Sequence, residues 1–96
     1  MAERIRIGVI GVGQIGKQHL SKYAKIPEAQ VTAVADINEA EAQKVSAEFS
    51  IPRVFTDFRK LLPSVDAVSL ATPTPTHHSL GAEILREGKH LLVEKP

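Results

Sequence analysis

The sequence predicts an α/β fold, a doubly wound parallel β-sheet of five strands with helices on both faces. Five short runs of apolar and β-branched residues, at 5–10, 31–35, 54–55, 67–71 and 91–93, alternate with longer segments of helical pattern. These runs are largely apolar throughout, as strands are when both faces of their sheet are covered. Strands joined by helical crossovers run parallel. The expected strand order is 3-2-1-4-5.

The first helix is expected over residues 14–25, between the first two strands, and Pro27 would stop it. Four side chains, spaced by four, four and three residues, are expected to face inward: Ile15, His19, Tyr23 and Ile26.

The second helix is expected to begin after Asn38, which with Glu41 forms an Asn-x-x-Glu capping box. Its buried stripe would consist of Ala42, Val45 and Phe49.

Two further helices are expected after the third and fourth strands. Residues 57–62 form a short one that Pro63 stops, and residues 76–87 form the other, with Gly88 at its end. The fourth strand is apolar except for Ser69.

Composition and charge exclude several function classes. Of 96 residues, 43% are hydrophobic and 24% charged, which is typical of a single globular domain. The net charge is +1 with both signs interspersed, so neither a nucleic-acid surface nor a membrane surface is expected. No residue is Cys, which excludes disulfides and thiolate sites, and no metal site is expected. The lack of cysteine and of a signal sequence at the N-terminus leads us to expect a cytoplasmic protein.

The most informative motif is GVGQIG at residues 11–16, which comprises Gly11, Val12, Gly13, Gln14, Ile15 and Gly16. A strand precedes this G-x-G-x-x-G pattern and a helix follows it, as in dinucleotide-binding folds. The first glycine permits the tight turn, the second lets a pyrophosphate approach the backbone, and the third lets the helix pack closely. The alternative is a glycine-rich turn that binds nothing.

The second part of this fingerprint is Asp36, twenty residues after Gly16 at the end of the second strand. A carboxylate there accepts hydrogen bonds from the ribose hydroxyls of NAD and repels the 2′-phosphate of NADP. Ile37 and the three residues after it offer no cation. We therefore expect NAD rather than NADP, the alternative being a turn aspartate that caps the next helix.

Residues after the fourth and fifth strands are expected at the same crevice, because ligands bind beyond the carboxyl ends of such strands. Thr72 and Pro73 follow the fourth strand, and His77 falls in the first turn of the next helix. Lys95 follows the fifth strand, where it is either a substrate-binding lysine or part of a solvated tail.

Together these motifs resemble the N-terminal domain of the Gfo/Idh/MocA oxidoreductases, the relatives of glucose–fructose oxidoreductase and inositol dehydrogenase. The residues that carry the resemblance are GVGQIG, the run Ala35-Asp36-Ile37-Asn38, the run Ala71-Thr72-Pro73 with His77, and Gly88-Lys89-His90 leading into Glu94-Lys95-Pro96. The resemblance implies that residues 1–96 form an NAD(P)-binding Rossmann domain and that Glu94 lies among the cofactor-binding residues. It implies a dehydrogenase acting on sugars, cyclitols or related polyols, in which Lys95 is catalytic.

Relatives of this family continue past this point with a sixth strand and a substrate domain, so we expect this chain to stop before both. It is then the cofactor-binding part of a dehydrogenase or, alternatively, a dinucleotide-binding module without activity of its own. The fifth strand is expected to lie at an edge of the sheet, and an uncovered apolar edge favours pairing with a second copy of the chain.

Overall fold

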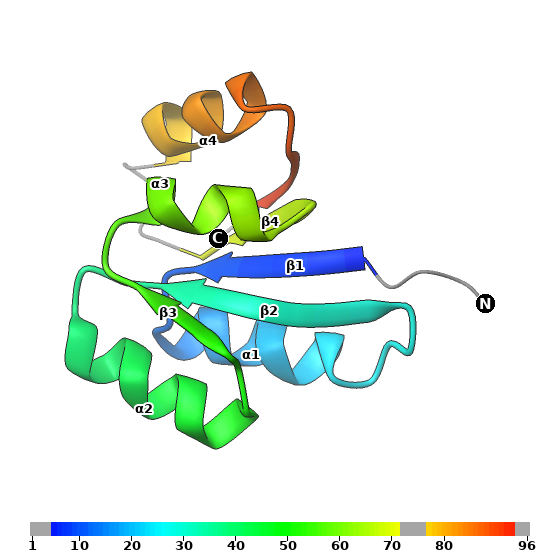
Figure 1. Cartoon of the computed structure of the whole chain (residues 1–96), viewed down its shortest axis with the longest axis vertical. Coiled ribbons are helices and arrows are strands. Elements are labelled where there is room, and N and C mark those ends of the chain that lie inside the picture. The colour runs from blue at the N-terminus through cyan, green and yellow to red at the C-terminus, as the bar shows by residue number, and fades with distance from the viewer. Residues whose placement is uncertain (1–4, 72–76, 94–96) are drawn as a thin grey trace.

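The computed structural model describes residues 5–71 and 77–93 and confirms the predicted sheet. Its five strands are all parallel, in the order β3-β2-β1-β4-β5 (Figure 1). They are β1 (Ile5–Ile10), β2 (Ala29–Ala35), β3 (Arg53–Phe55), β4 (Ala67–Leu70) and β5 (His90–Val93).

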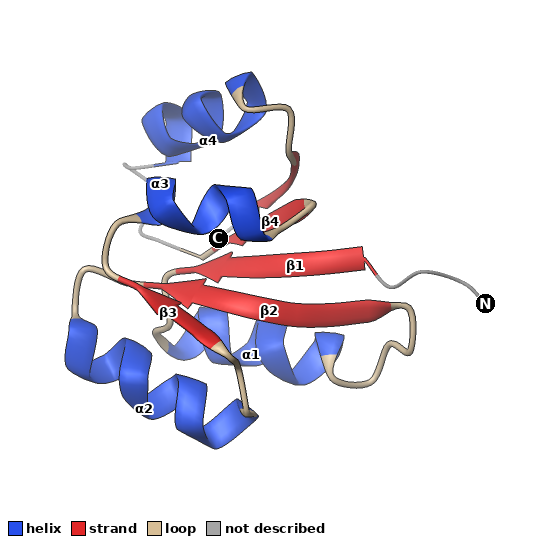
Figure 2. Cartoon of the chain, viewed as in Figure 1, coloured by secondary structure: helices blue, strands red, loops and turns tan. Residues whose placement is uncertain are grey.

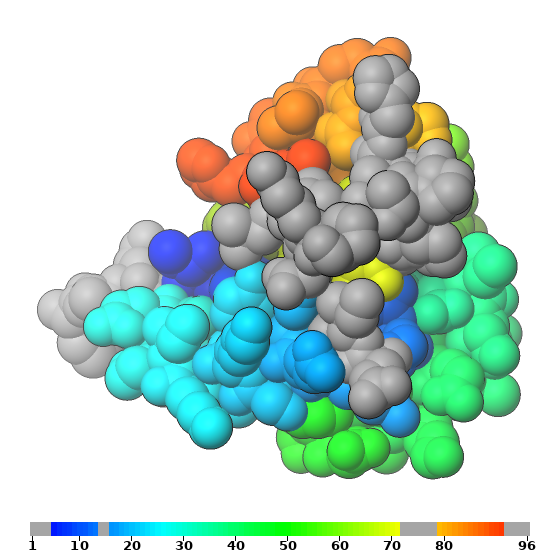
Figure 3. Space-filling model, turned by 180° about the vertical axis from the view of Figure 1, so that it is seen from behind, coloured from blue at the N-terminus to red at the C-terminus, as the bar shows by residue number. Residues whose placement is uncertain are grey.

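Helices cover both faces of the sheet, as a doubly wound fold requires (Figure 2). On one face lie α1 (Gln14–Tyr23) and α2 (Glu39–Phe49); on the other lie α3 (Phe58–Leu61) and α4 (His77–Arg86). Seen from behind, α4 lies at one end of the long axis and the blue-to-green residues of α1 and α2 lie at the other (Figure 3). None of the helices in the described ranges is long and apolar enough to cross a membrane.

Successive side chains of the central strands enter two separate cores, one on each side of the sheet. Val9 and Val34 pack against α1 and α2, together with Leu20 and Val45. The second core lies under α3 and α4 and contains Ile10, Ala33, Ala35, Leu61, Leu62, Val65, Val68, Leu70 and Ile84. Each fully buried Val, Leu or Ile contributes about 1.5–3 kcal/mol.

The inward face of α1 differs from the one predicted. Ile26 is 43% exposed, so its predicted burial is wrong, and Leu20 is the large apolar side chain that is fully buried. The cause lies at the helix end: the backbone N–H of Ile26 donates to the carbonyl of Tyr23, a tighter turn that takes Ile26 off the helical face. The helix therefore ends at Tyr23, two residues before the predicted boundary.

Pro63 does not simply stop a helix. It lies in a short 3₁₀ helix, Leu62–Ser64, that continues α3, because a proline near the start of such a turn needs no amide partner. Gly88 has a φ of 76°, which fits its predicted place after α4.

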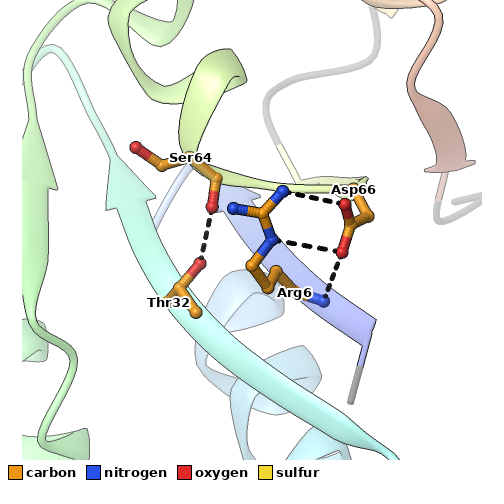
Figure 4. Close-up of polar contacts among 4 residues, drawn as sticks. All are labelled: Arg6, Thr32, Ser64 and Asp66. Atoms are coloured by element: carbon orange, nitrogen blue, oxygen red, sulfur yellow. Dashed lines mark hydrogen bonds and ion pairs between the residues drawn. The ribbon is translucent and has the colours of Figure 1, made fainter. Parts of the chain in front are cut away.

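The amino end of the sheet is held by an ion pair between β1 and the residue before β4. The guanidinium of Arg6 donates to both carboxylate oxygens of Asp66, at 3.0 and 3.3 Å, and the backbone N–H of Arg6 donates to the same carboxylate (Figure 4). These hydrogen bonds lower the pKa of Asp66 from 3.8 to about 2. Beside the pair, the hydroxyl of Thr32 donates to the carbonyl of Ser64 at 3.1 Å.

Candidate dinucleotide-binding site

The glycine motif forms the turn from β1 into α1, at the carboxyl end of the sheet. Gly11 has a φ of 91°, a conformation that L side chains rarely adopt, and its N–H donates to the carbonyl of Ala35 at 2.8 Å. Gly13 is the N-cap of α1, and no side chain of the described residues caps the helix. The first amides of α1 therefore leave a position for an anion, which the helix dipole also favours.

The other two glycines of the motif have different physical reasons for lacking a side chain. A Cβ at Gly16 would lie 2.0 Å from the carbonyl oxygen of Gly11, so α1 packs on the turn only because residue 16 is glycine. A Cβ at Gly13 would meet no atom within 4 Å. Because no protein atom in the described part of the chain requires glycine at position 13, the space beside it is free for a ligand.

Asp36 follows β2 directly and touches the turn that holds the glycines. Its Oδ2 accepts a hydrogen bond from the N–H of Val12 at 2.9 Å, and its Oδ1 accepts one from the N–H of Asn38 at 2.8 Å. Each carboxylate oxygen can accept a further hydrogen bond. The carboxylate is therefore held beside the glycine turn with capacity left for two hydroxyl groups.

The predicted capping box is correct in one half and wrong in the other. The side chain of Asn38 accepts from the N–H of Glu41 at 3.1 Å and so caps α2, as predicted. The N–H of Asn38, however, donates to Asp36 rather than to the side chain of Glu41. The alternative interpretation of Asp36 as a turn residue thus describes part of its role.

Ile37 is the next residue and is 94% exposed. An isoleucine so exposed gains no burial within the domain. Its side chain therefore leaves an apolar surface directly after Asp36 in the chain.

The remaining predicted site residues are only partly within the described ranges. The backbone of Gln14 and Ile15 forms the start of α1, and that of His77 forms the start of α4. Thr72, Pro73, Glu94 and Lys95 lie outside the described residues. Within the described ranges there is no group of three His, Asp or Glu residues that could hold a metal ion.

A buried polar pair, not among the predicted site residues, joins α1 to β4. His19 of α1 and Ser69 of β4 are 6% and 0% exposed, and a short hydrogen bond joins Nδ1 of the histidine to Oγ of the serine. The ring of His19 also contacts the ring of Tyr23 edge-on, with the centroids 6.5 Å apart. The signal was in the sequence, since His19 falls on the predicted inward face and Ser69 is the one polar residue of its strand.

A separate hollow of about 250 Å³ lies on the α1–α2 side of the sheet, toward the amino end of β2. Its lining includes Tyr23, Ile26, Gln30 and Phe49. No predicted site residue lines it, so it is distinct from the glycine turn.

Comparison with known proteins agrees with this fold and places the chain in a family. Residues 5–96 match a family model described as the oxidoreductase family, NAD-binding Rossmann fold, of the Gfo/Idh/MocA type. The chain is 45% identical over 92 residues to UDP-N-acetylglucosamine 3-dehydrogenase of Acidithiobacillus ferrooxidans, a match that covers 96% of this chain and 28% of that protein. It is 42% identical to inositol 2-dehydrogenase of Rubrobacter xylanophilus, over 99% of this chain and 28% of that protein. The chain thus spans less than a third of the length of these curated relatives.

A solved structure shares the fold closely. The scyllo-inositol dehydrogenase of Lactobacillus casei, crystallised with bound NAD(H) and scyllo-inositol, superposes with a TM-score of 0.90 at 33% identity. The superposition covers 98% of this chain and 28% of that one.

Proposed function

The chain belongs to the Gfo/Idh/MocA family of oxidoreductases with an NAD-binding Rossmann fold, and on this basis we propose that it is the cofactor-binding part of an NAD-dependent dehydrogenase. The substrate class that we propose is a sugar, a cyclitol such as an inositol, or a related polyol. Relatives named for inositol and for a nucleotide sugar support this class.

The residues around the glycine turn fit the dinucleotide. The amides at the start of α1 would bind the pyrophosphate beside Gly13, and the carboxylate of Asp36 would accept hydrogen bonds from the adenosine ribose. The exposed side chain of Ile37 would cover the adenine ring. Bound NAD supplies the hydride acceptor, which no amino-acid side chain provides.

Further residues are assigned to the site by family resemblance. We propose that Thr72, Pro73, His77 and Glu94 line the same crevice, and that Lys95 binds the substrate hydroxyl and assists its deprotonation.

The observation that carries the proposal is the open space at Gly13, where no atom of the described residues gives a reason for glycine. Calorimetric titration of the chain with NADH and NADPH tests it directly. We expect NADH to bind more tightly, because Asp36 would lie against the 2′-phosphate of NADPH. Equal affinities, or tighter NADPH binding, would contradict the role given to Asp36, and no binding of either would contradict the function.

Two finer features are also proposed. β5 is an edge of the sheet in the described part of the chain, and we propose that it pairs with β5 of a second copy to form a homodimer. Light scattering over a concentration series tests this: a Leu92→Lys variant should remain monomeric, and a dimer that tolerates this change would use another surface.

We propose a cytoplasmic location, which cell fractionation tests.

A further inference from the structure

The pair formed by His19 and Ser69 links the two halves of the sheet on which a dinucleotide would lie. His19 belongs to α1, which begins at the glycine turn, and Ser69 belongs to β4, one residue before that strand ends. A bound dinucleotide extends from the half of the sheet that contains β1 to the half that contains β4, at the point where the strand order reverses. The hydrogen bond between His19 and Ser69 therefore connects the two halves at the place where a dinucleotide would bridge them.

The contacts around the pair show how the link is built. Gly16 and His19 lie three residues apart, on one face of α1. The Cβ position of Gly16 is 3.7 Å from the side chain of Val9, which is paired in register with Ser69 across β1 and β4. The same face of α1 thus rests on the glycine turn, then on β1, and ends in a hydrogen bond to β4.

A hydrogen bond at this place has a property that apolar packing lacks. Apolar contacts tolerate small sliding movements, whereas a hydrogen bond weakens steeply when its distance or angle changes. Burial strengthens this restraint, because a separated Ser69 hydroxyl would have lost its solvent without a partner.

We propose that His19 and Ser69 are positioning residues that hold the glycine turn and the end of β4 at the separation that a whole dinucleotide needs. The inference rests on the proposed function, because it assumes that the site binds NAD. It predicts that the pair matters for NADH, which reaches past β4, and not for ADP, which uses only the glycine turn and Asp36.

The test compares NADH and ADP binding by the purified chain, using calorimetry and the fluorescence of bound NADH. His19→Leu and His19→Asn are a matched pair, since leucine and asparagine have similar shapes and only asparagine keeps a polar atom near the position of Nδ1. Ser69→Ala removes the same bond from the other side. Circular dichroism and thermal unfolding of each variant report whether the fold is intact.

We expect His19→Leu and Ser69→Ala to weaken NADH binding about tenfold, the size of one hydrogen bond. The affinity for ADP should change less than about twofold. His19→Asn should keep NADH affinity nearer to that of the unmodified chain, although leucine is the better helix former. The double variant should bind NADH no more weakly than His19→Leu alone, because the histidine change already removes the bond that Ser69→Ala removes.

Three results would overturn the inference: equal losses for ADP and NADH, NADH affinity that follows thermal stability across the variants, or equal affinities for the Leu and Asn variants. In each case the proposed function would stand, provided that the unmodified chain binds NADH. If the unmodified chain binds neither ligand, the proposed function fails and the inference fails with it.

Discussion

The Oδ2 atom of Asp36 accepts a hydrogen bond from the backbone N–H of Val12, which joins the end of β2 to the middle of the glycine turn. Asp36, the proposed partner of the ribose hydroxyls, therefore also stabilises the glycine turn, which is the proposed binding site of the pyrophosphate. Under the proposed function, a change at position 36 would therefore alter both the cofactor preference and the geometry of the glycine turn.

Replacing Asp36 with Ala should weaken NADH binding by at least about tenfold and narrow the preference over NADPH, because hydrogen bonds to a charged group are lost. The free energy of unfolding should fall by about 1–2 kcal/mol, since the amides of Val12 and Asn38 lose their partner. Calorimetry and urea unfolding measure the two effects.

Asp57→Ala is the matched control for that variant. Asp57 likewise accepts from an amide two residues further on, that of Arg59, but it caps α3. We expect a loss of about 1 kcal/mol of stability with NADH affinity unchanged. A similar loss of NADH affinity in both variants would mean that Asp36 acts only through stability.

The two glycines Gly13 and Gly16 should respond differently to substitution. Gly13→Val should leave the free energy of unfolding within about 1 kcal/mol of its original value and lower NADH affinity at least about tenfold. The reason is that a Cβ at position 13 would meet no atom of the described residues, whereas it would occupy the space proposed for the pyrophosphate. Gly16→Ala should cost about 3 kcal/mol, because its Cβ would lie 2.0 Å from the carbonyl oxygen of Gly11. Thermal unfolding beside NADH titration separates the two; strong destabilisation by Gly13→Val would refute the ligand-based explanation.

Acid should remove the contribution of the Arg6–Asp66 pair. Because folding lowers the pKa of Asp66 from 3.8 to about 2, the pair stabilises the fold fully above about pH 4. The contribution decreases as the pH falls below about 4 and is lost as it falls through about 2, where the folded-state carboxylate takes up its proton. Urea unfolding of the unmodified chain and of Asp66→Asn should therefore differ at pH 5 and converge at low pH. A difference that stays constant would exclude this ionisation as the cause.

Two predictions concern catalysis. The first is that the 96-residue chain alone should form no NADH from inositols or aldoses, since orientation of the substrate by further groups supplies much of a catalytic rate. The second concerns the catalytic role proposed for Lys95. In a full-length relative, replacing the lysine that matches Lys95 with alanine should lower kcat at least about 100-fold and leave NADH affinity nearly unchanged. Turnover by the purified chain would contradict the first outcome, and loss of NADH affinity would contradict the second.

The topology could be predicted because it depends on local patterns. Apolar runs such as residues 5–10 and 67–71, joined by helical segments, leave few arrangements of parallel strands once crossovers are right-handed. The helix boundary at Tyr23 could not be read in the same way, because it depends on a turn that forms hydrogen bonds at Ile26.

The contacts of the site were harder to predict than its residues. The glycines and Asp36 are recognised by spacing alone, but the bond from Val12 to Asp36 depends on how the turn folds over the end of β2. The bond between His19 and Ser69 joins residues 50 positions apart, and it follows only once α1 is placed over β4.

The central position of β1 also bears on the order in which the chain folds. β1 precedes β2 and β4 in the chain, and the contacts where it meets β4 join residues as distant as Arg6 and Asp66, 60 positions apart. Long loops must close before such contacts form, which makes parallel pairing slow. When refolding is followed by pulsed hydrogen exchange, the backbone amides of β2 should therefore become protected before those of β4. Until β4 arrives, one side of β1 is an open backbone edge, and a nascent chain at that stage is at its most prone to aggregation.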